Sequence, residues 1–428
     1  MRDTPQPKGN SMDIFDKCNK EGGYLGMLRV AKDKYFTRPI LAPKPGPEME
    51  FNGHKTIMWS INSYLGMAGN EEIRQVAKDA IEQYGPAAPM GSRMLTGNTT
   101  HHEALEDRLA RFENKEAAIL FNYGYLGVLG TMSALVDRSD TIVIDKLSHA
   151  CMIDGTFLSG GNHRFFKHND MNDLEKQLTA ARAKGSGGIL IVTEGVFGMR
   201  GDLANLPDIC ALKQKYGARL FVDDAHGCGV MGPNGRGTTE HFGVMDKVDL
   251  YFSTFAKAFA AIGGFTAGNE QVVRYIVYNA RTHIFAKSLP MIYVKVAEKT
   301  LDLIEKRPEL RLRMWEVAKR LQEGLRELGY NLGDTASPVT PVYVPGDLEV
   351  AMNVIFYLRE KKGIFVSGVM YPVVPKGVIL LRMIPTASHT DEQIAVTLDA
   401  FKCLRDEFKL HLDNVKVSAP DSGGGMGA

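Results

Sequence analysis

Short apolar runs alternate with longer amphipathic stretches through the first two thirds of the chain. The runs are rich in β-branched residues and predict buried strands at 117–121, 141–144, 188–193, 219–222 and 250–252. Between them, stretches such as 174–183 and 206–215 place apolar residues at helical spacing. This alternation predicts an α/β domain with a mostly parallel central sheet flanked by helices.

The pattern changes after about residue 290. Apolar residues recur every three or four positions from Leu310 to Leu328, between Pro308 and Gly329, which predicts one long amphipathic helix. Strand-like runs and further helices follow, so we expect a smaller α+β domain; the runs are 339–344, 364–366 and 378–383, and the helices lie near 349–361 and from Asp391.

These patterns predict a division of the chain into four parts. They are an N-terminal segment (1–60), a large α/β domain (61–290), a small C-terminal α+β domain (291–410) and a flexible tail (411–428). Residues 1–11 are polar and are expected to be disordered, and the last residues, SAPDSGGGMGA, are of low complexity.

The composition narrows the class of protein. The chain has 428 residues, of which 44% are hydrophobic and 24% charged, as in ordinary soluble proteins. Its 51 basic and 50 acidic residues leave a net charge of +1, which argues against a nucleic-acid or anionic-membrane surface. The five cysteines have no metal-ligand spacing, so no metal site is expected. Since no apolar stretch is long enough to span a bilayer, we expect a cytoplasmic protein, either free or peripheral to the membrane.

The strongest chemical signal is a lysine in apolar surroundings. Lys257 follows the strand 250–252 and precedes a run of small residues and glycines. Such surroundings lower the pKa of a lysine and make it a usable nucleophile. Upstream, Asp223 ends a predicted strand and His226 follows three positions later. An acid and a histidine in this order suit the pyridinium and the phenolic oxygen of pyridoxal 5′-phosphate (PLP).

Other residues fit the surroundings of such a cofactor. Gly124 and Tyr125 follow the strand 117–121 and open an apolar helix, whose backbone N–H groups could bind a phosphate. The Thr254 hydroxyl could donate a hydrogen bond to that phosphate, or it could be an ordinary hydroxyl at the end of a strand. His149 could be an ordinary histidine in a turn, or it could stack on the cofactor ring and supply a proton. Arg382 interrupts an apolar strand and needs a partner, for which a substrate carboxylate is suitable.

Six segments together resemble the α-oxoamine synthases, which are PLP enzymes of fold type I. The resemblance covers roughly residues 20–410, and residues 35–40 and 57–67 are most similar to bacterial serine palmitoyltransferases. The six segments, in the order found in the family, are 62–66, 91–98, 145–155, 223–229, 254–264 and 382–390.

The resemblance implies a role for each candidate residue. Lys257 would form the Schiff base with PLP, Asp223 would meet the pyridine nitrogen and His226 the phenolic oxygen, while His149 would stack on the ring. The residues implied on the phosphate side are Gly124, Tyr125 and Thr254. Those implied at the amino acid are Asn62 and Arg382.

The chain departs from the family pattern at three places. Ala256 replaces a common serine, and Lys287 stands where relatives carry a small residue that reaches the phosphate of the neighbouring subunit. The glycine- and proline-rich segment 84–91 is one residue longer than usual. The resemblance implies a homodimer with shared active sites, in which Lys287 either contacts the cofactor phosphate or selects an anionic amino acid.

The function implied is a decarboxylative condensation of a small L-amino acid with a long-chain fatty acyl thioester. The amino acid would be serine or an anionic analogue such as cysteate, and the acyl carrier either coenzyme A or acyl carrier protein. The product would be a 3-keto long-chain base for sphingolipids or sulfonolipids. The alternatives are an 8-amino-7-oxononanoate synthase, a 2-amino-3-ketobutyrate ligase, an aminotransferase or an inactive subunit of a heteromeric enzyme. The intact Lys257, Asp223 and His226 argue against the last.

Overall fold

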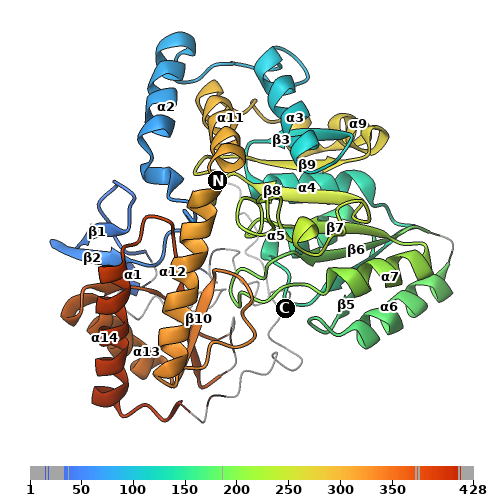
Figure 1. Ribbon diagram of the computed structural model, residues 1–428. Coiled ribbons are helices and arrows are strands. Elements are labelled where there is room, and N and C mark those ends of the chain that lie inside the picture. Colours follow the sequence, from blue (N-terminus) through green and yellow to red (C-terminus); the bar gives the residue numbers. More distant parts are fainter. Residues whose placement is uncertain are drawn as a thin grey trace, which may run out of the picture.

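A seven-stranded sheet forms the centre of the computed structural model, which describes residues 15, 18, 33–36, 38–185, 187–371, 374, 376–412 and 415 (Figure 1). The strand order is β3-β9-β8-β7-β6-β4-β5. All neighbours are parallel except β9, which runs antiparallel to both β3 and β8. The strands are β3 (Ala117–Phe121), β4 (Thr141–Asp145), β5 (Asn162–Phe166), β6 (Ile189–Glu194), β7 (Arg219–Asp223), β8 (Leu250–Thr254) and β9 (Gly264–Gly268).

Helices cover both faces of this sheet, because alternate strand residues point to opposite sides. On one face Ile142 and Ile144 pack in a core with α4, α5 and α9. On the other, Val143 packs with α6 and α7, and Leu120 with α3 and α11. The helices of this part are α2 (Glu71–Tyr84), α3 (Thr100–Phe112), α4 (Gly124–Leu135), α5 (Ala150–Ser159), α6 (Met171–Lys184), α7 (Leu206–Tyr216), α8 (Thr238–His241), α9 (Glu270–Asn279), α10 (Arg281–Ile284) and α11 (Met291–Lys306), with the 3-10 turn η3 (Met67–Gly69).

A second, smaller unit packs beside the large sheet (Figure 1). Its antiparallel sheet has the order β10-β13-β12, and β1 and β2 near the N-terminus pair with β11 in another sheet. Trp59 joins these parts, since its indole N–H donates to Thr397 Oγ1 at 3.0 Å. The elements are α1 (Asp33–Phe36), β1 (Glu48–Phe51), β2 (His54–Met58), α12 (Pro308–Glu327), β10 (Thr340–Pro345), α13 (Leu348–Phe356), η4 (Tyr357–Lys361, a π-helix), β11 (Ile364–Phe365), β12 (Ser367–Val369), β13 (Val378–Met383) and α14 (Asp391–Phe408).

Local sequence explains where several helices begin. Asn70 caps α2 by accepting from the N–H groups of Glu72 and Ile73. Thr390 and Gln393 form a reciprocal capping box at α14. Pro308 occupies the first turn of α12, where its missing N–H removes no helical hydrogen bond.

The predicted fold class is confirmed: a mixed, mostly parallel sheet is flanked by helices and followed by a smaller C-terminal sheet. All five predicted strands of the large sheet are present, whereas β5 and β9 were not predicted. Helix α11, which begins at the start of the predicted small domain, packs on α2 and α3 of the large part. The segments 1–11 and 418–428, predicted to be disordered and flexible, lie outside the described residues.

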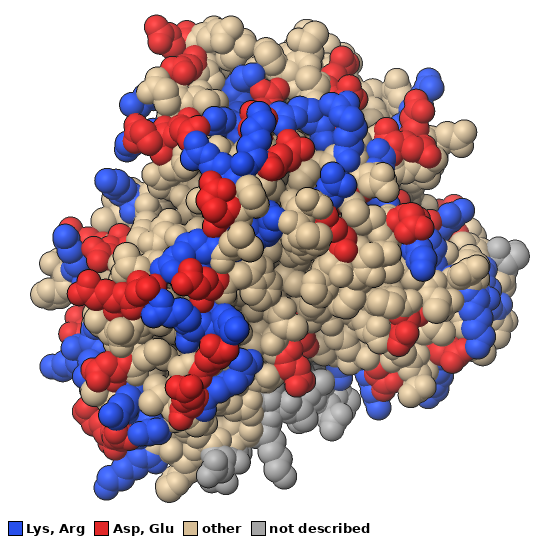
Figure 2. Space-filling view, viewed as in Figure 1, with Lys and Arg blue, Asp and Glu red and all other residues tan. Residues whose placement is uncertain are grey.

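Figure 2 shows basic and acidic side chains interspersed over the visible face, in keeping with the small net charge. Within the described ranges no helix is long and apolar enough to cross a membrane, and no group of His, Cys, Asp or Glu could hold a metal ion.

Candidate active site

The predicted site residues gather at the carboxyl ends of the central strands. Asp223 ends β7 and is in register with Glu194, which ends β6. Thr254 ends β8, and its hydroxyl donates to the Gly263 carbonyl at 3.0 Å. Ligands of open α/β sheets bind in this position, so the strand order itself assembles the site.

Gly124, at the start of α4, lies against Thr254. A Cβ at position 124 would come within 2.7 Å of Thr254 Oγ1, so only glycine lets the helix approach the end of β8 this closely. The N-cap residue, Tyr123, makes no side-chain cap, which leaves the first N–H groups of α4 for another acceptor. A phosphate fits these backbone N–H groups, and the Thr254 hydroxyl would donate to it after turning away from the Gly263 carbonyl.

Asp223 and Lys257 are a pair of charged groups enclosed by protein. Burial raises the pKa of Asp223, against the opposing charges of Lys257 and His149. Burial likewise lowers the pKa of Lys257, against the charges of Asp223 and Glu194. Among the described residues, the Lys257 ammonium forms no hydrogen bond and no ion pair. An acid for a pyridine nitrogen and an amine for an aldehyde are the groups that PLP requires, and here the acid accepts, of the residues described, only from the Ala225 N–H at 3.1 Å and, weakly, from the Cys151 thiol.

His149 caps α5 and is exposed as a residue, although burial of its imidazole lowers its pKa. Its Nδ1 accepts from the Cys151 N–H at 3.3 Å, and the Cys151 thiol lies 3.9 Å from Asp223 Oδ2. The ring of Tyr125 meets the His149 ring edge-on, with centroids 6.3 Å apart, and its hydroxyl donates to Asp154. The structure therefore holds His149 beside Asp223, through Cys151, where a planar cofactor that meets Asp223 would also lie near the His149 ring.

Tyr64 is a site residue that the sequence analysis did not select. Its hydroxyl hydrogen-bonds His226 Nδ1 at 2.7 Å, and its backbone has a φ of 28°, in the left-handed region. On the other side of the ring, a Cβ at Gly198 would overlap His226 Nε2. Tyr64 lies within the quoted segment 62–66, but its aromatic side chain reads as an ordinary core residue.

Arg382 reaches the site from β13 of the smaller unit. Its Nε donates to the Gly198 carbonyl at 2.5 Å and its Nη2 to Asn62 Oδ1 at 3.2 Å. Burial lowers the pKa of Arg382, yet it forms no ion pair with a carboxylate in the part of the chain that the structure describes. A buried guanidinium held only by neutral acceptors suits an anionic ligand.

Glu194, at the end of β6, is another residue that the sequence analysis did not select as a site residue. It is buried and accepts from the Gly198 N–H at 3.2 Å. Burial and the neighbouring Asp223 raise its pKa to about 8. Glu194 therefore adds a second acid beside Asp223 and Lys257.

Lys287 stands apart from these contacts. Its ammonium donates to the Ala87 carbonyl at 2.6 Å, and its own carbonyl accepts from the Asn122 side chain. Because Asn122 precedes α4, Lys287 lies next to the loop that leads to Gly124. The other predicted residues lie together at the strand ends, the start of α4 and the adjoining strand β13. They are Lys257, Asp223, His226, His149, Gly124, Tyr125, Thr254, Asn62 and Arg382.

Both the sequence and the structure of this chain are similar to those of known proteins. Residues 54–401 match the family of class I and II aminotransferases. The chain is 50% identical over 400 residues to a cysteate-C-fatty acyltransferase of Capnocytophaga ochracea, covering 93% of this chain and 95% of that protein. It is 39% identical to an 8-amino-7-oxononanoate synthase of Alkaliphilus oremlandii, covering 90% and 96% of the two chains. A serine palmitoyltransferase variant from S. paucimobilis, solved with bound PLP and myriocin, superposes with a TM-score of 0.86 at 31% identity over 93% of this chain and 100% of that one.

Proposed function

Because the chain belongs to the class I and II aminotransferase family, and within it to the α-oxoamine synthase-like PLP enzymes, we propose that it condenses cysteate with a long-chain fatty acyl thioester. The 50% identity to a cysteate-C-fatty acyltransferase over 93% of the chain carries this proposal. A bond forms between the amino-acid Cα and the acyl carbonyl, the thioester C–S bond breaks, and the amino-acid carboxyl group leaves as CO₂. The product is a sulfonated 3-keto long-chain base.

PLP is the cofactor, and it supplies an electron sink for the charge that develops at Cα. Lys257 would hold it covalently, Asp223 would face its pyridine nitrogen and His226 its phenolic oxygen. The start of α4 and the Thr254 hydroxyl would hold its phosphate. His149, beside Asp223, would stack on the cofactor ring.

The side chains around this pocket have separate roles in binding the amino acid and moving protons. Burial lowers the pKa of Lys257, so that its amine is more readily neutral and able to accept the α-proton. Arg382 and Asn62 bind the amino-acid carboxylate and fix which bond at Cα faces the base. His149 is placed to hold a proton near the carbon–carbon bond that forms.

Arg382→Ala tests the carboxylate site. Since one partner of a buried charge-assisted pair would be lost, amino-acid binding should weaken by about 2 to 5 kcal/mol. The measurement is a spectral titration of the holoenzyme with cysteate, serine and alanine, with PLP affinity measured in parallel. Arg405→Ala, on the surface of α14, serves as the control. A normal amino-acid affinity in Arg382→Ala would place the carboxylate elsewhere.

We further propose a homodimer with shared active sites. Large apolar side chains near Lys287 are exposed in the single chain, as a contact with a second copy would require. They are Met90 (77% exposed), Leu95 (83%) and Phe285 (74%). In the dimer, Lys287 would serve the active site through one of two contacts, the cofactor phosphate or the sulfonate of cysteate.

Lys287→Thr distinguishes these two contacts. If Lys287 selects the sulfonate, cysteate turnover should fall about 10- to 100-fold, the value of a charge-assisted hydrogen bond, while serine turnover is spared or improved. If it binds the phosphate, PLP should bind more weakly whichever amino acid is present. The measurements are kcat/KM for each amino acid and the PLP dissociation constant.

The proposed activity is tested by a panel of cysteate, serine, glycine and alanine, each with palmitoyl-CoA and then palmitoyl acyl carrier protein. Product masses identify the amino acid that is used. Cysteate should give the largest kcat/KM. A shorter dicarboxylic acyl donor is added to the panel with each amino acid, and its exclusive use with alanine would favour the alternative, an 8-amino-7-oxononanoate synthase, to one of which the chain is 39% identical. No turnover of cysteate would disprove the proposal.

A further inference from the structure

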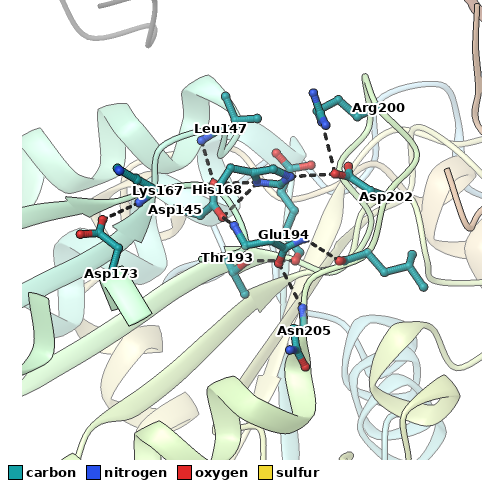
Figure 3. Close-up of polar contacts among 12 residues, drawn as sticks. Asp145, Leu147, Lys167, His168, Asp173, Thr193, Glu194, Arg200, Asp202 and Asn205 are labelled. Carbon is teal, nitrogen blue, oxygen red and sulfur yellow. Dashed lines mark hydrogen bonds and ion pairs between the residues drawn. The ribbon is translucent and has the colours of Figure 1, made fainter. Parts of the chain in front are cut away.

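A buried histidine, His168, lies between the carboxylates of Asp145 and Asp202 (Figure 3). His168 follows β5, and its side chain is 4% exposed. Its Nδ1 lies 3.1 Å from both oxygens of Asp145, and its Nε2 lies 2.7 Å from Asp202 Oδ2. Because both ring nitrogens face carboxylate oxygens, both must donate, and only an imidazolium has two N–H donors.

The charged groups facing His168 favour this state. Burial opposes protonation, but the hydrogen bonds and charges of Asp145 and Asp202 raise the pKa of His168 to about 9. Burial also opposes ionisation of Asp202, yet His168 and Arg200 hold the pKa of Asp202 below its usual value. Arg200 Nε lies 3.2 Å from the same oxygen of Asp202.

Each carboxylate belongs to a different active-site loop. Asp145 ends β4, and its side chain and carbonyl accept from the N–H groups of Leu147 and Ser148, which form the turn leading to His149. Asp202 lies in the loop after β6, where its carbonyl accepts from the Phe197 N–H.

The second loop carries Gly198, which touches two site residues. Its carbonyl accepts from Arg382, and its lack of a side chain leaves room for the His226 ring. Beside His168, the Asn169 amide donates to the Leu203 carbonyl at 2.8 Å. His168 and Asn169 therefore both bind the loop after β6.

We propose that His168 is a positioning residue for the active site: its imidazolium, held between Asp145 and Asp202, fixes the loop of His149 and the loop of Gly198 against each other. Through the Gly198 carbonyl it fixes the position of the Arg382 guanidinium, and thereby the position of the amino-acid carboxylate that Arg382 binds. The inference depends on the proposed roles of His149 and Arg382, but not on which amino acid or acyl donor is used.

His168→Gln tests the proposal, because glutamine keeps one donor but has no charge. Amino-acid affinity, measured by spectral titration with every amino acid that binds the wild type, should fall about 10-fold or more, and kcat up to about 100-fold, since small displacements of catalytic groups are costly. His163→Gln, on the exposed side of β5, should leave both unchanged. A purely structural histidine would lower the melting temperature without changing the amino-acid dissociation constant well below the transition, and that result would overturn the proposal.

The protonation state can be measured without the cofactor or any variant. In ¹⁵N-histidine spectra of the apo-protein at pH 8, one ring should carry protons on both nitrogens and lose one near pH 9. Absence of such a ring would overturn the proposal, even if His168→Gln failed to fold.

Linkage gives the sign of the effect on stability. The folded-state pKa of about 9 exceeds the unfolded value of about 6.5, so the contribution is complete below about pH 6.5 and disappears as pH rises through about 9. The difference in melting temperature between wild-type and His168→Gln apo-protein should therefore shrink between pH 7 and 10. A difference that stays constant would mean that the charge of His168 contributes nothing to holding the loops.

Discussion

Replacing Lys257 with alanine should lower kcat by about 10⁴-fold or more and end multiple turnover. The variant would lose the covalent attachment of PLP and the base that accepts the α-proton, and a positioned base alone contributes about 10²- to 10⁴-fold. Its pocket is otherwise intact, since the Lys257 ammonium makes no hydrogen bond within the described part of the chain. The variant should therefore fold and still bind PLP, without the visible band of the lysine-bound cofactor.

Borohydride reduction provides the direct measurement. Wild-type protein treated with borohydride should carry the cofactor on the peptide that contains Lys257, as read by mass spectrometry. Lys319→Ala, which removes an exposed lysine of α12, should keep both the label and the turnover. Full turnover by Lys257→Ala would show that another amine performs this chemistry.

The second large effect is expected for Asp223→Asn. Asparagine is similar in size but leaves the pyridine nitrogen without its anionic partner, so the cofactor withdraws charge from Cα less effectively. Loss of one partner of a buried charge pair costs about 3 to 5 kcal/mol, which corresponds to roughly 100- to 4,000-fold. The rate of α-proton exchange of the amino acid in deuterated water should fall by this factor.

The neighbouring residue supplies a matched control. Asp224 is also a buried acid, but its carboxylate turns away and accepts from the Thr238 N–H at 2.6 Å and the Tyr251 hydroxyl at 3.3 Å. Asp224→Asn should lower stability without a comparable loss of exchange per bound PLP. Equal losses of exchange in both variants would mean that Asp223 has no special role at the ring.

The strands that carry the site could be predicted because they are apolar and parallel. β6, β7 and β8 are buried on both faces, so their sequences are nearly continuous apolar runs that end in Glu194, Asp223 and Thr254. β9, with the sequence GFTAG, reads as a glycine-rich loop instead. Its pairing with β3 and β8 depends on tertiary contacts that local propensity does not encode.

The contacts between site residues could not be predicted from the sequence, for a different reason. Lys257 was conspicuous because a buried lysine violates the usual pattern of the core. Tyr64 and His168 violate no such pattern, since a buried tyrosine and a histidine after a strand are common. Their partners, His226, Asp145 and Asp202, are distant along the chain, and only the folded structure brings them together.

The antiparallel direction of β9 has a consequence for how the protein folds. Lys257 lies in the connection between β8 and β9, which pair as a hairpin, so its loop closes by contacts that are local in sequence. Hairpins form in about 1 to 10 μs, whereas parallel strands must wait for their long crossover connections to order. Asp223 reaches its place by such a parallel pairing. During folding, the segment with the reactive amine can therefore form before the acid that completes the pocket arrives, and capture of the cofactor in its working orientation depends on the slower of the two events.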